Sequence, residues 1–223
     1  MSYIFGSCEK FDPLFEFAPY STFDDNNDFG EESTFGASCK FGVGNHFCER
    51  TTFAPRCTFG AHNIFGSDVE FGEFNMLGGH TMVNTRAVFG FGATFGEYCY
   101  IGGHSTIGNR ATFGYHNSVG NDVVIGTHAQ LGESFSHGER LTIEGVKAIA
   151  LMNMRNVAGS GRDILIIVHT EGIKIRAGSF VGSLGEFSLQ AGEEGNLRCA
   201  LVVTAAAKAL AEDVEQSSET GGW

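Results

Sequence analysis

Four side chains that can bind a ligand or move a proton recur in this chain at steps of 18 residues: His62, His80, Tyr98 and His116. A histidine exchanges protons near neutral pH and can act as a general base, so His80 and His116 are the candidates for catalysis. The four residues together are a candidate binding column. Exposed positions that accept any polar residue give the same pattern, and we favour this non-catalytic interpretation.

A second group of candidate residues is acidic. The chain has a net charge of −12, and residues 1–32 hold eight acids and one lysine, a net charge of −7. Such a chain repels phosphate, so we expect no direct binding to nucleic acid. The candidate binding residues here are Asp24, Asp25, Asp28, Glu31 and Glu32. They either present an acidic surface to a partner that normally holds DNA, or only keep the protein in solution.

The elements that must position these residues follow from a strict period of six. A large apolar residue stands at every sixth position from Phe5 to Leu131, over 22 hexads without an insertion. Phenylalanine fills 15 of these positions, glycine usually follows, and a small residue usually stands four places later. A period of six does not fit a helix of 3.6 residues per turn, but it suits short strands with alternate residues inward, separated by turns. We expect the glycine to relax the backbone as each strand enters a turn.

Three hexads make a triangular coil of 18 residues, so residues 18 apart stack. One predicted corner column alternates in charge: Glu32, Arg50, Asp68, Arg86, His104 and Asp122. One inward column holds polar residues whose side chains can hydrogen-bond along the stack: Asn27, Asn45, Asn63, Thr81, Cys99 and Asn117. Cys39 and Cys57 stack in another inward column, where we expect packing rather than a disulfide.

Residues 4–135 resemble the hexapeptide-repeat family, most closely in the stretch "YIGGHSTIGNRATFGYHNSVGNDVVIGTHAQLG" (100–132). The resemblance implies a left-handed parallel β-helix of about seven coils, so the fold class is mainly β. Most members are acyltransferases that use acetyl-CoA or acyl carrier protein, and a minority are carbonic anhydrases; both classes are usually trimers. Acyltransferases of this family commonly push loops out of the coils, and this chain has none over its 22 hexads.

The carbonic anhydrase pattern within this family implies a histidine, a second one two coils later and a third five residues further on. His80 and His116 match the first spacing, but the third position is Asn121. The three-histidine set is incomplete, so we predict no metal and no cofactor. Catalysis by His80 or His116 remains the alternative to a binding role.

Beyond Leu131 the pattern stops, and a small α+β domain is predicted over 136–214. "DILIIVHTEGIKIRAGSF" predicts a β-hairpin that turns at Glu171–Gly172. "SLGEFSLQAG" and "LRCALVVTAAAKALAEDV" predict two helices, with Ser183 capping the first. Residues 215–223 are expected to form a frayed tail. The run "IKIRAGSFVGSLGEF" resembles a module of uncharacterised bacteriophage and prophage proteins.

An outer column of the predicted β-helix is more apolar than solvent requires, and we interpret it as a subunit interface or as the seat of the C-terminal domain: His46, Ile64, Met82 and Tyr100. A homo-oligomer is expected: the family resemblance implies a trimer, and the C-terminal domain offers a dimer as the alternative. The six cysteines contain no CxxC pair and no long apolar run is present, which favours a cytoplasmic protein without membrane contact.

These observations favour a non-enzymatic, phage-type binding protein. It would inhibit, sequester or mimic a host component, with a host protein or a small signalling molecule as partner, in the host cytoplasm. Two alternatives stay open: an acyltransferase that uses CoA, and a structural component of the virion.

Overall fold

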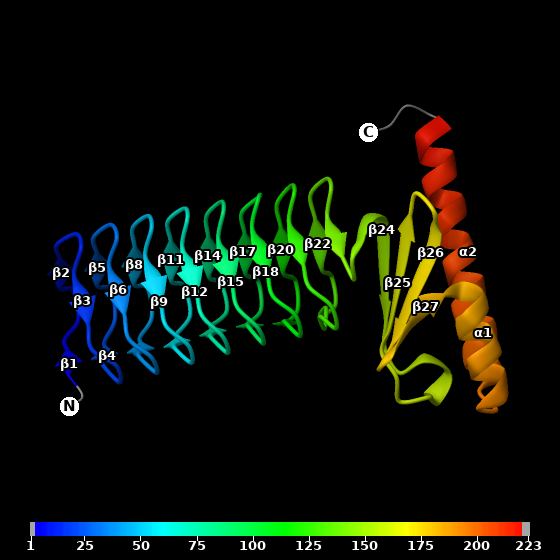
Figure 1. Cartoon of the computed structure of the whole chain (residues 1–223), viewed down its shortest axis with the longest axis horizontal. Coiled ribbons are helices and arrows are strands. Elements are labelled where there is room, and N and C mark those ends of the chain that lie inside the picture. Colours follow the sequence, from blue (N-terminus) through cyan, green and yellow to red (C-terminus); the bar gives the residue numbers. More distant parts are fainter. Residues whose placement is uncertain (1–2, 220–223) are drawn as a thin grey trace. The chain divides into compact units, whose positions relative to one another are not determined.

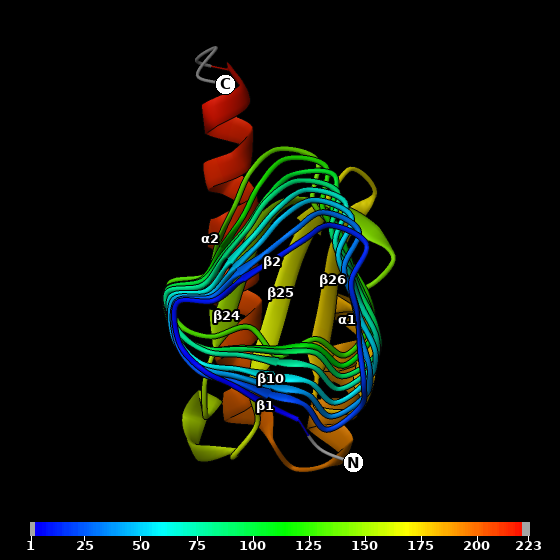
Figure 2. The same cartoon turned by 90° about the vertical axis from the view of Figure 1, so that its left-hand side faces the viewer.

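The computed structural model describes residues 3–219, and the chain divides into two compact units, residues 1–145 and 146–223. The first unit is a left-handed parallel β-helix, built from two-residue strands that succeed one another every six residues (Figure 1). Each strand pairs in parallel with the strand 18 residues away, as in Thr58↔Met76 and Met76↔Thr94. The coils therefore superimpose as three flat sides when viewed along the β-helix (Figure 2).

Three parallel sheets make up these sides, and we name them sheets A, B and C. Sheet A contains β1 (Ile4–Phe5), β4 (Thr22–Phe23), β7 (Lys40–Phe41), β10 (Thr58–Phe59), β13 (Met76–Leu77), β16 (Thr94–Phe95) and β19 (Thr112–Phe113). Sheet B contains β2 (Lys10–Phe11), β5 (Asp28–Phe29), β8 (His46–Phe47), β11 (Ile64–Phe65), β14 (Met82–Val83), β17 (Tyr100–Ile101), β20 (Ser118–Val119) and β22 (Ser136–His137). Sheet C contains β3 (Glu16–Phe17), β6 (Thr34–Phe35), β9 (Thr52–Phe53), β12 (Glu70–Phe71), β15 (Val88–Phe89), β18 (Thr106–Ile107), β21 (Val124–Ile125) and β23 (Thr142–Ile143).

The predicted fold class is confirmed, and the β-helix extends further than the sequence pattern indicated. Strands β22 and β23 pair with β20 and β21, which completes an eighth coil and moves the end of this unit from residue 135 to residue 145. The position of the expected large apolar residue in β22 is held by His137, which hid this coil in the sequence. Leu141 and Ile143 then resume the buried pattern.

The core of the β-helix is a set of three phenylalanine ladders. Phe47 stacks on Phe29 and Phe65, with ring centroids 4.7 and 4.8 Å away and planes within 6° of parallel. Its ring also meets Phe41 on sheet A and Phe53 on sheet C, edge to face at 5.1 and 5.0 Å. Aromatic rings favour both arrangements. Phenylalanines six residues apart pack edge to face, and those 18 residues apart stack face to face.

The small inward positions hold a polar ladder, as predicted. The backbone N–H of Asn45 donates to Oδ1 of Asn63 at 2.8 Å, and Nδ2 of Asn63 donates to the carbonyl of Gly60 at 2.7 Å. Asn45 and Asn63 are fully buried, so these bonds satisfy groups that water cannot reach. Cys39 and Cys57 are buried free thiols, as expected, and the neighbouring Cys39 thiol, together with burial, raises the pKa of Cys57.

The glycine that follows the large residue has a different role from the predicted one. A Cβ at Gly60 would lie 2.7 Å from the carbonyl oxygen of Gly42 in the preceding coil. The close approach of stacked coils, not an unusual backbone angle, therefore favours glycine at this position. The left-handed conformation occurs two residues further on and is adopted by larger residues, such as Arg50 with φ 58° and His62 with φ 60°.

The second unit is an antiparallel sheet with two helices, and it confirms the predicted hairpin and helices. Its elements are β24 (Val146–Met154), the short 3-10 helix η1 (Val157–Gly159), β25 (Ile164–His169), β26 (Gly172–Ala177), β27 (Phe180–Ser183), α1 (Leu184–Glu193) and α2 (Leu197–Glu219). β25 pairs with β24 and β26, and β26 pairs with β27, so the hairpin is the centre of four strands. The hairpin turns at residues 170–171, between His169 and Gly172, one position before the predicted turn.

The capping of α1 is as predicted, and the end of α2 is not. The Ser183 hydroxyl accepts a hydrogen bond from the backbone N–H of Glu186, while the Glu186 carboxylate accepts one from the N–H of Ser183 at 2.7 Å. This capping box holds the pKa of Glu186 below its usual value. Of the predicted frayed tail, residues 215–219 belong to α2, and 220–223 lie outside the described residues.

Candidate binding surface

The predicted column of histidines and Tyr98 is a continuous stack of rings on the corner between sheets A and B. Ring centroids are 4.9 Å apart from His62 to His80, 5.1 Å from His80 to Tyr98 and 4.7 Å from Tyr98 to His116. Neighbouring planes lie within 12° of parallel. Each residue has φ between 56° and 60°, so the left-handed corner directs all four side chains alike.

This stack is an exposed ladder whose rings cover each other's faces and leave their edges accessible. Such edges can donate and accept hydrogen bonds. Stacking holds the rings in this arrangement before any partner binds. His80 and His116, the candidate bases, are separated by the ring of Tyr98. The structure therefore places them as members of one surface, without bringing them together as a pair.

The carbonic anhydrase pattern is not assembled. Asn121 lies at the corner between sheets B and C, where its Oδ1 accepts a hydrogen bond from the backbone N–H of Glu139 at 2.8 Å. Over the described residues 3–219, no group of three or more His, Cys, Asp or Glu side chains is arranged to hold a metal ion.

The predicted outer column lies on sheet B, directly beside the stacked corner. His46, Ile64, Met82 and Tyr100 are partners in register along β8, β11, β14 and β17. The side chains of Ile64, Met82 and Tyr100 are exposed by 46%, 52% and 44%. The first members of the column are the polar residues Lys10, Asp28 and His46. Asp28 contacts Lys10 at 3.7 Å and His46 at 3.6 Å. It therefore changes from charged to apolar along the β-helix.

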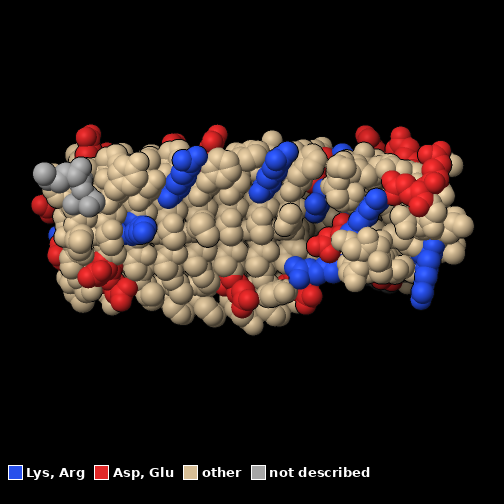
Figure 3. Space-filling view, turned by 90° about the horizontal axis from the view of Figure 1, so that it is seen from below, with Lys and Arg blue, Asp and Glu red and all other residues tan. Residues whose placement is uncertain are grey.

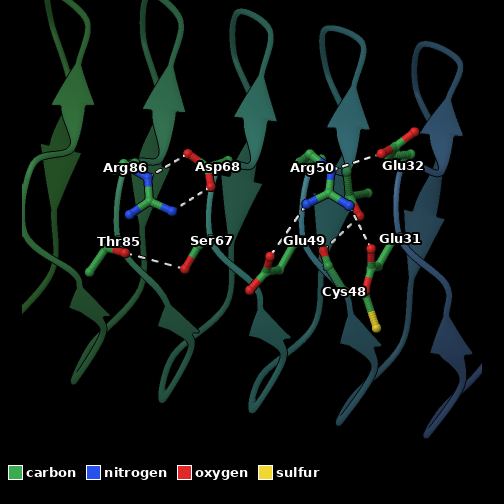
Figure 4. A network of polar contacts seen from close by, with 10 residues as sticks. Glu31, Glu32, Cys48, Glu49, Arg50, Ser67, Asp68, Thr85 and Arg86 are labelled. Atoms are coloured by element: carbon green, nitrogen blue, oxygen red, sulfur yellow. Dashed lines mark hydrogen bonds and ion pairs between the residues drawn. The ribbon is translucent and has the colours of Figure 1, made fainter.

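The other edge of sheet B is a corner of ion pairs, which confirms the predicted alternation of charge (Figure 4). Arg86 binds Asp68 through two hydrogen bonds of 2.6 Å, and Arg140 binds Asp122 in the same way. The guanidinium of Arg86 lowers the pKa of Asp68, and Asp68 raises that of Arg86. These pairs hold side chains of the corner in place and leave the apolar column of sheet B between two ordered edges.

The five acidic candidates do not form one cluster. Glu31 and Glu32 both bind Arg50, at 2.5 and 2.8 Å, and so belong to the ion-pair corner. Asp25 accepts a hydrogen bond from the backbone N–H of Val43 at 2.6 Å on the corner with the stacked rings, where Asp24 precedes it. Asp28 lies on sheet B between these corners. The acids lie along one side of a single coil and at its two corners, and part of their charge is neutralised locally.

Sheet A presents a surface of another kind, which the sequence reasoning did not single out as a site. Its face carries few charged side chains across the middle coils (Figure 3). Met76 stands there between Thr58 and Thr94 and is exposed by 52%, the same fraction as Met82 on sheet B. The available signal was the spacing of six residues: Met76 precedes Met82 by six, so it holds the equivalent outward position on the adjacent sheet.

A second exposed apolar surface, on α1 and α2, was also missed. Leu189, Leu197 and Leu201 are exposed by 72%, 65% and 71%. The available signal was the stretch from Cys199 to Ala211, which holds only one charged residue. Among the described residues, no helix combines the length and hydrophobicity needed to cross a membrane.

Comparison with known proteins gives no relative: no family model, no curated protein and no solved structure matches this chain.

Proposed function

We propose that the protein is a non-catalytic, phage-type binding protein, which inhibits, sequesters or mimics a component of its host in the host cytoplasm. The observation that carries this proposal is the exposed column of Ile64, Met82 and Tyr100 beside the stacked rings of the neighbouring corner. We call the column and the four stacked rings together the sheet B surface.

The composition of the sheet B surface is that of a protein interface. Tyrosine and methionine are enriched in interfaces, and tyrosine often dominates their binding energy. Tyr98 and Tyr100 lie on the corner and on the adjoining strand of this surface, and Met82 precedes Tyr100 in the column. Because these residues stand on paired strands of a hydrogen-bonded sheet, their backbone loses little conformational freedom on binding.

The regularity of the coils supports binding over acyl transfer. Strands follow one another at steps of six residues from β1 to β21, and no inserted loop rises beside His80 or His116. In the acyltransferases that the repeat resembles, such loops form walls of the substrate cleft. An extended surface of this kind suits a macromolecular partner better than a small acyl acceptor.

Two exposed methionines offer a matched test. Met82→Glu places a charge in the sheet B surface, and Met76→Glu places the same charge on sheet A, at a site of equal exposure. The wild-type chain and both variants are immobilised, incubated with bacterial lysate and washed, and retained proteins are identified by mass spectrometry. We expect a partner retained by wild type and Met76→Glu and lost with Met82→Glu.

Retention that is equal for all three chains, or lost only with Met76→Glu, would contradict the proposed surface. The two alternatives have their own measurements. Titration of the wild-type chain with CoA and acetyl-CoA by calorimetry tests the acyltransferase, and detection of the chain in purified phage particles tests the virion component. Binding of CoA that His80→Ala abolishes would replace the proposal with the enzyme.

A further inference from the structure

Helix α2 is apolar on two opposite faces. One face packs in the core of the second unit through the buried residues Cys199, Ala200, Val203 and Ala207. The opposite face is exposed, yet it carries Leu201, Val202, Ala205 and Ala209. A helix that exposes several apolar residues opposite its buried face normally packs against a further surface there, so we expect this face of α2 to be covered.

Helix α1 extends the same exposed surface. The hydroxyls of Ser188 and Thr204 are 3.3 Å apart, which places α1 alongside α2 at this level. Leu189 follows Ser188 and is exposed by 72%, and Leu201, one turn before Ala205 on α2, is exposed by 71%. The two helices thus present large apolar side chains on both sides of their contact.

The exposed face of α2 is complementary to itself about Ala205. With 100° per residue, Arg198 and Glu212 lie about 20° to either side of Ala205, and Leu201 and Ala209 about 40° to either side. All five residues are exposed. A second α2 running antiparallel across Ala205 would therefore place Arg198 opposite Glu212 twice. It would also place each large Leu201 opposite a small Ala209.

We propose that two copies of this chain form a two-fold symmetric dimer through the exposed face of α2, with Ala205 at the symmetry axis. An isologous contact requires a surface that is complementary to itself, and both charge and side-chain size meet that condition here. Val202 comes opposite Lys208, whose aliphatic stem can cover it while the ammonium reaches water. The antiparallel arrangement also opposes the two helix dipoles. This interface does not depend on the sheet B surface.

The test is sedimentation velocity of the full-length chain over a concentration series, with matched variants. Leu201→Glu puts a charge in the proposed interface, and Leu14→Glu makes the same change at a leucine of the β-helix that is exposed by 69%. We expect a dimer whose Kd rises at least about tenfold with Leu201→Glu and is unchanged with Leu14→Glu. Thermal unfolding of each variant verifies that it folds.

Charge reversal decides the orientation and does not depend on the leucine variants. Arg198→Glu alone and Glu212→Arg alone place like charges opposite each other, and each should weaken the dimer. The double variant restores two opposite-charge pairs, and its Kd should return to within about threefold of wild type. A monomer at about 100 μM, a trimer, a dimer indifferent to Leu201→Glu, or a double variant no better than the single ones would overturn the proposal. A monomer that instead binds another protein through α2 would also overturn it.

Discussion

The phenylalanine ladder makes a quantitative prediction at Phe47. This side chain is fully buried, stacks on two rings at 4.7 and 4.8 Å and meets four more rings edge to face. Phe47→Ala removes the ring from a ladder that the coils above and below hold apart, so the cavity cannot close. We expect a loss of about 4–5 kcal/mol, the upper part of the range for such substitutions.

Two further substitutions separate the contribution of volume from that of the stacked rings. Phe47→Leu keeps an apolar side chain, of the kind that other hexads use at Leu77, and should cost about 1–2 kcal/mol. Phe5→Ala removes a ring that is partly exposed and stacks only on Phe23 among the described residues, so it should cost less than Phe47→Ala.

The assay is urea unfolding followed by far-ultraviolet circular dichroism, for the wild type and the three variants. The slope of each transition shows whether the variant unfolds as the wild type does. A loss below about 1 kcal/mol for Phe47→Ala, or an equal loss for Phe5→Ala, would show that the continuous ladder is not the main source of stability.

Three other predictions concern the polar ladder, the coil spacing and the helix cap. Asn63→Ala leaves the buried N–H of Asn45 without its 2.8 Å acceptor, so it should lower the unfolding free energy by about 1–3 kcal/mol in the same urea assay. The control is Asn109→Ala, which removes a comparable bond to the exposed N–H of Thr127 and should lower the unfolding free energy less. Gly60→Ala should lower the unfolding free energy by about 1–3 kcal/mol, because its Cβ meets Gly42. Gly185→Ala in α1, where a Cβ meets nothing within 4 Å, should not destabilise the protein. Equal effects of the two substitutions would contradict the close approach of the coils. Ser183→Ala should lower the melting temperature of the second unit at pH 7, because it removes the side-chain half of the capping box. Since the pKa of Glu186 is lowered in the folded state, the capping contribution is fully present above the ordinary glutamate pKa and is lost as pH falls from there through the lowered pKa of the folded state. A difference in melting temperature between variant and wild type that is the same at pH 7 and pH 3 would argue against this coupling.

The sequence was sufficient to predict the β-helix because its two signals are periodic. Large residues at steps of six define the inward ladder, and charges at steps of 18 define the corner where Arg86 meets Asp68. The same reasoning failed at His137, where one polar residue in a ladder position ended the pattern although the coil continued to Ile143.

Other features depended on geometry that spacing does not carry. The stacking of His80 on Tyr98 requires that both residues adopt the left-handed conformation and similar side-chain orientations. The acids from Asp24 to Glu32 are close in sequence, but one strand and its two turns separate them onto sheet B and its two corners. The exposed face of α2 became visible only when the packing of Val203 and Ala207 showed which side of the helix is buried.

We expect sheet B with its adjoining corner to be the surface that contacts the partner. Oxidative footprinting measures it most directly, because Met76 and Met82 are exposed by 52% each and oxidise to sulfoxides that mass spectrometry resolves. The chain is oxidised alone and in complex with the partner recovered from lysate. We expect the partner to slow oxidation of Met82 and to leave that of Met76 unchanged. Equal oxidation of Met82 in both states, or protection of Met76 alone, would contradict it.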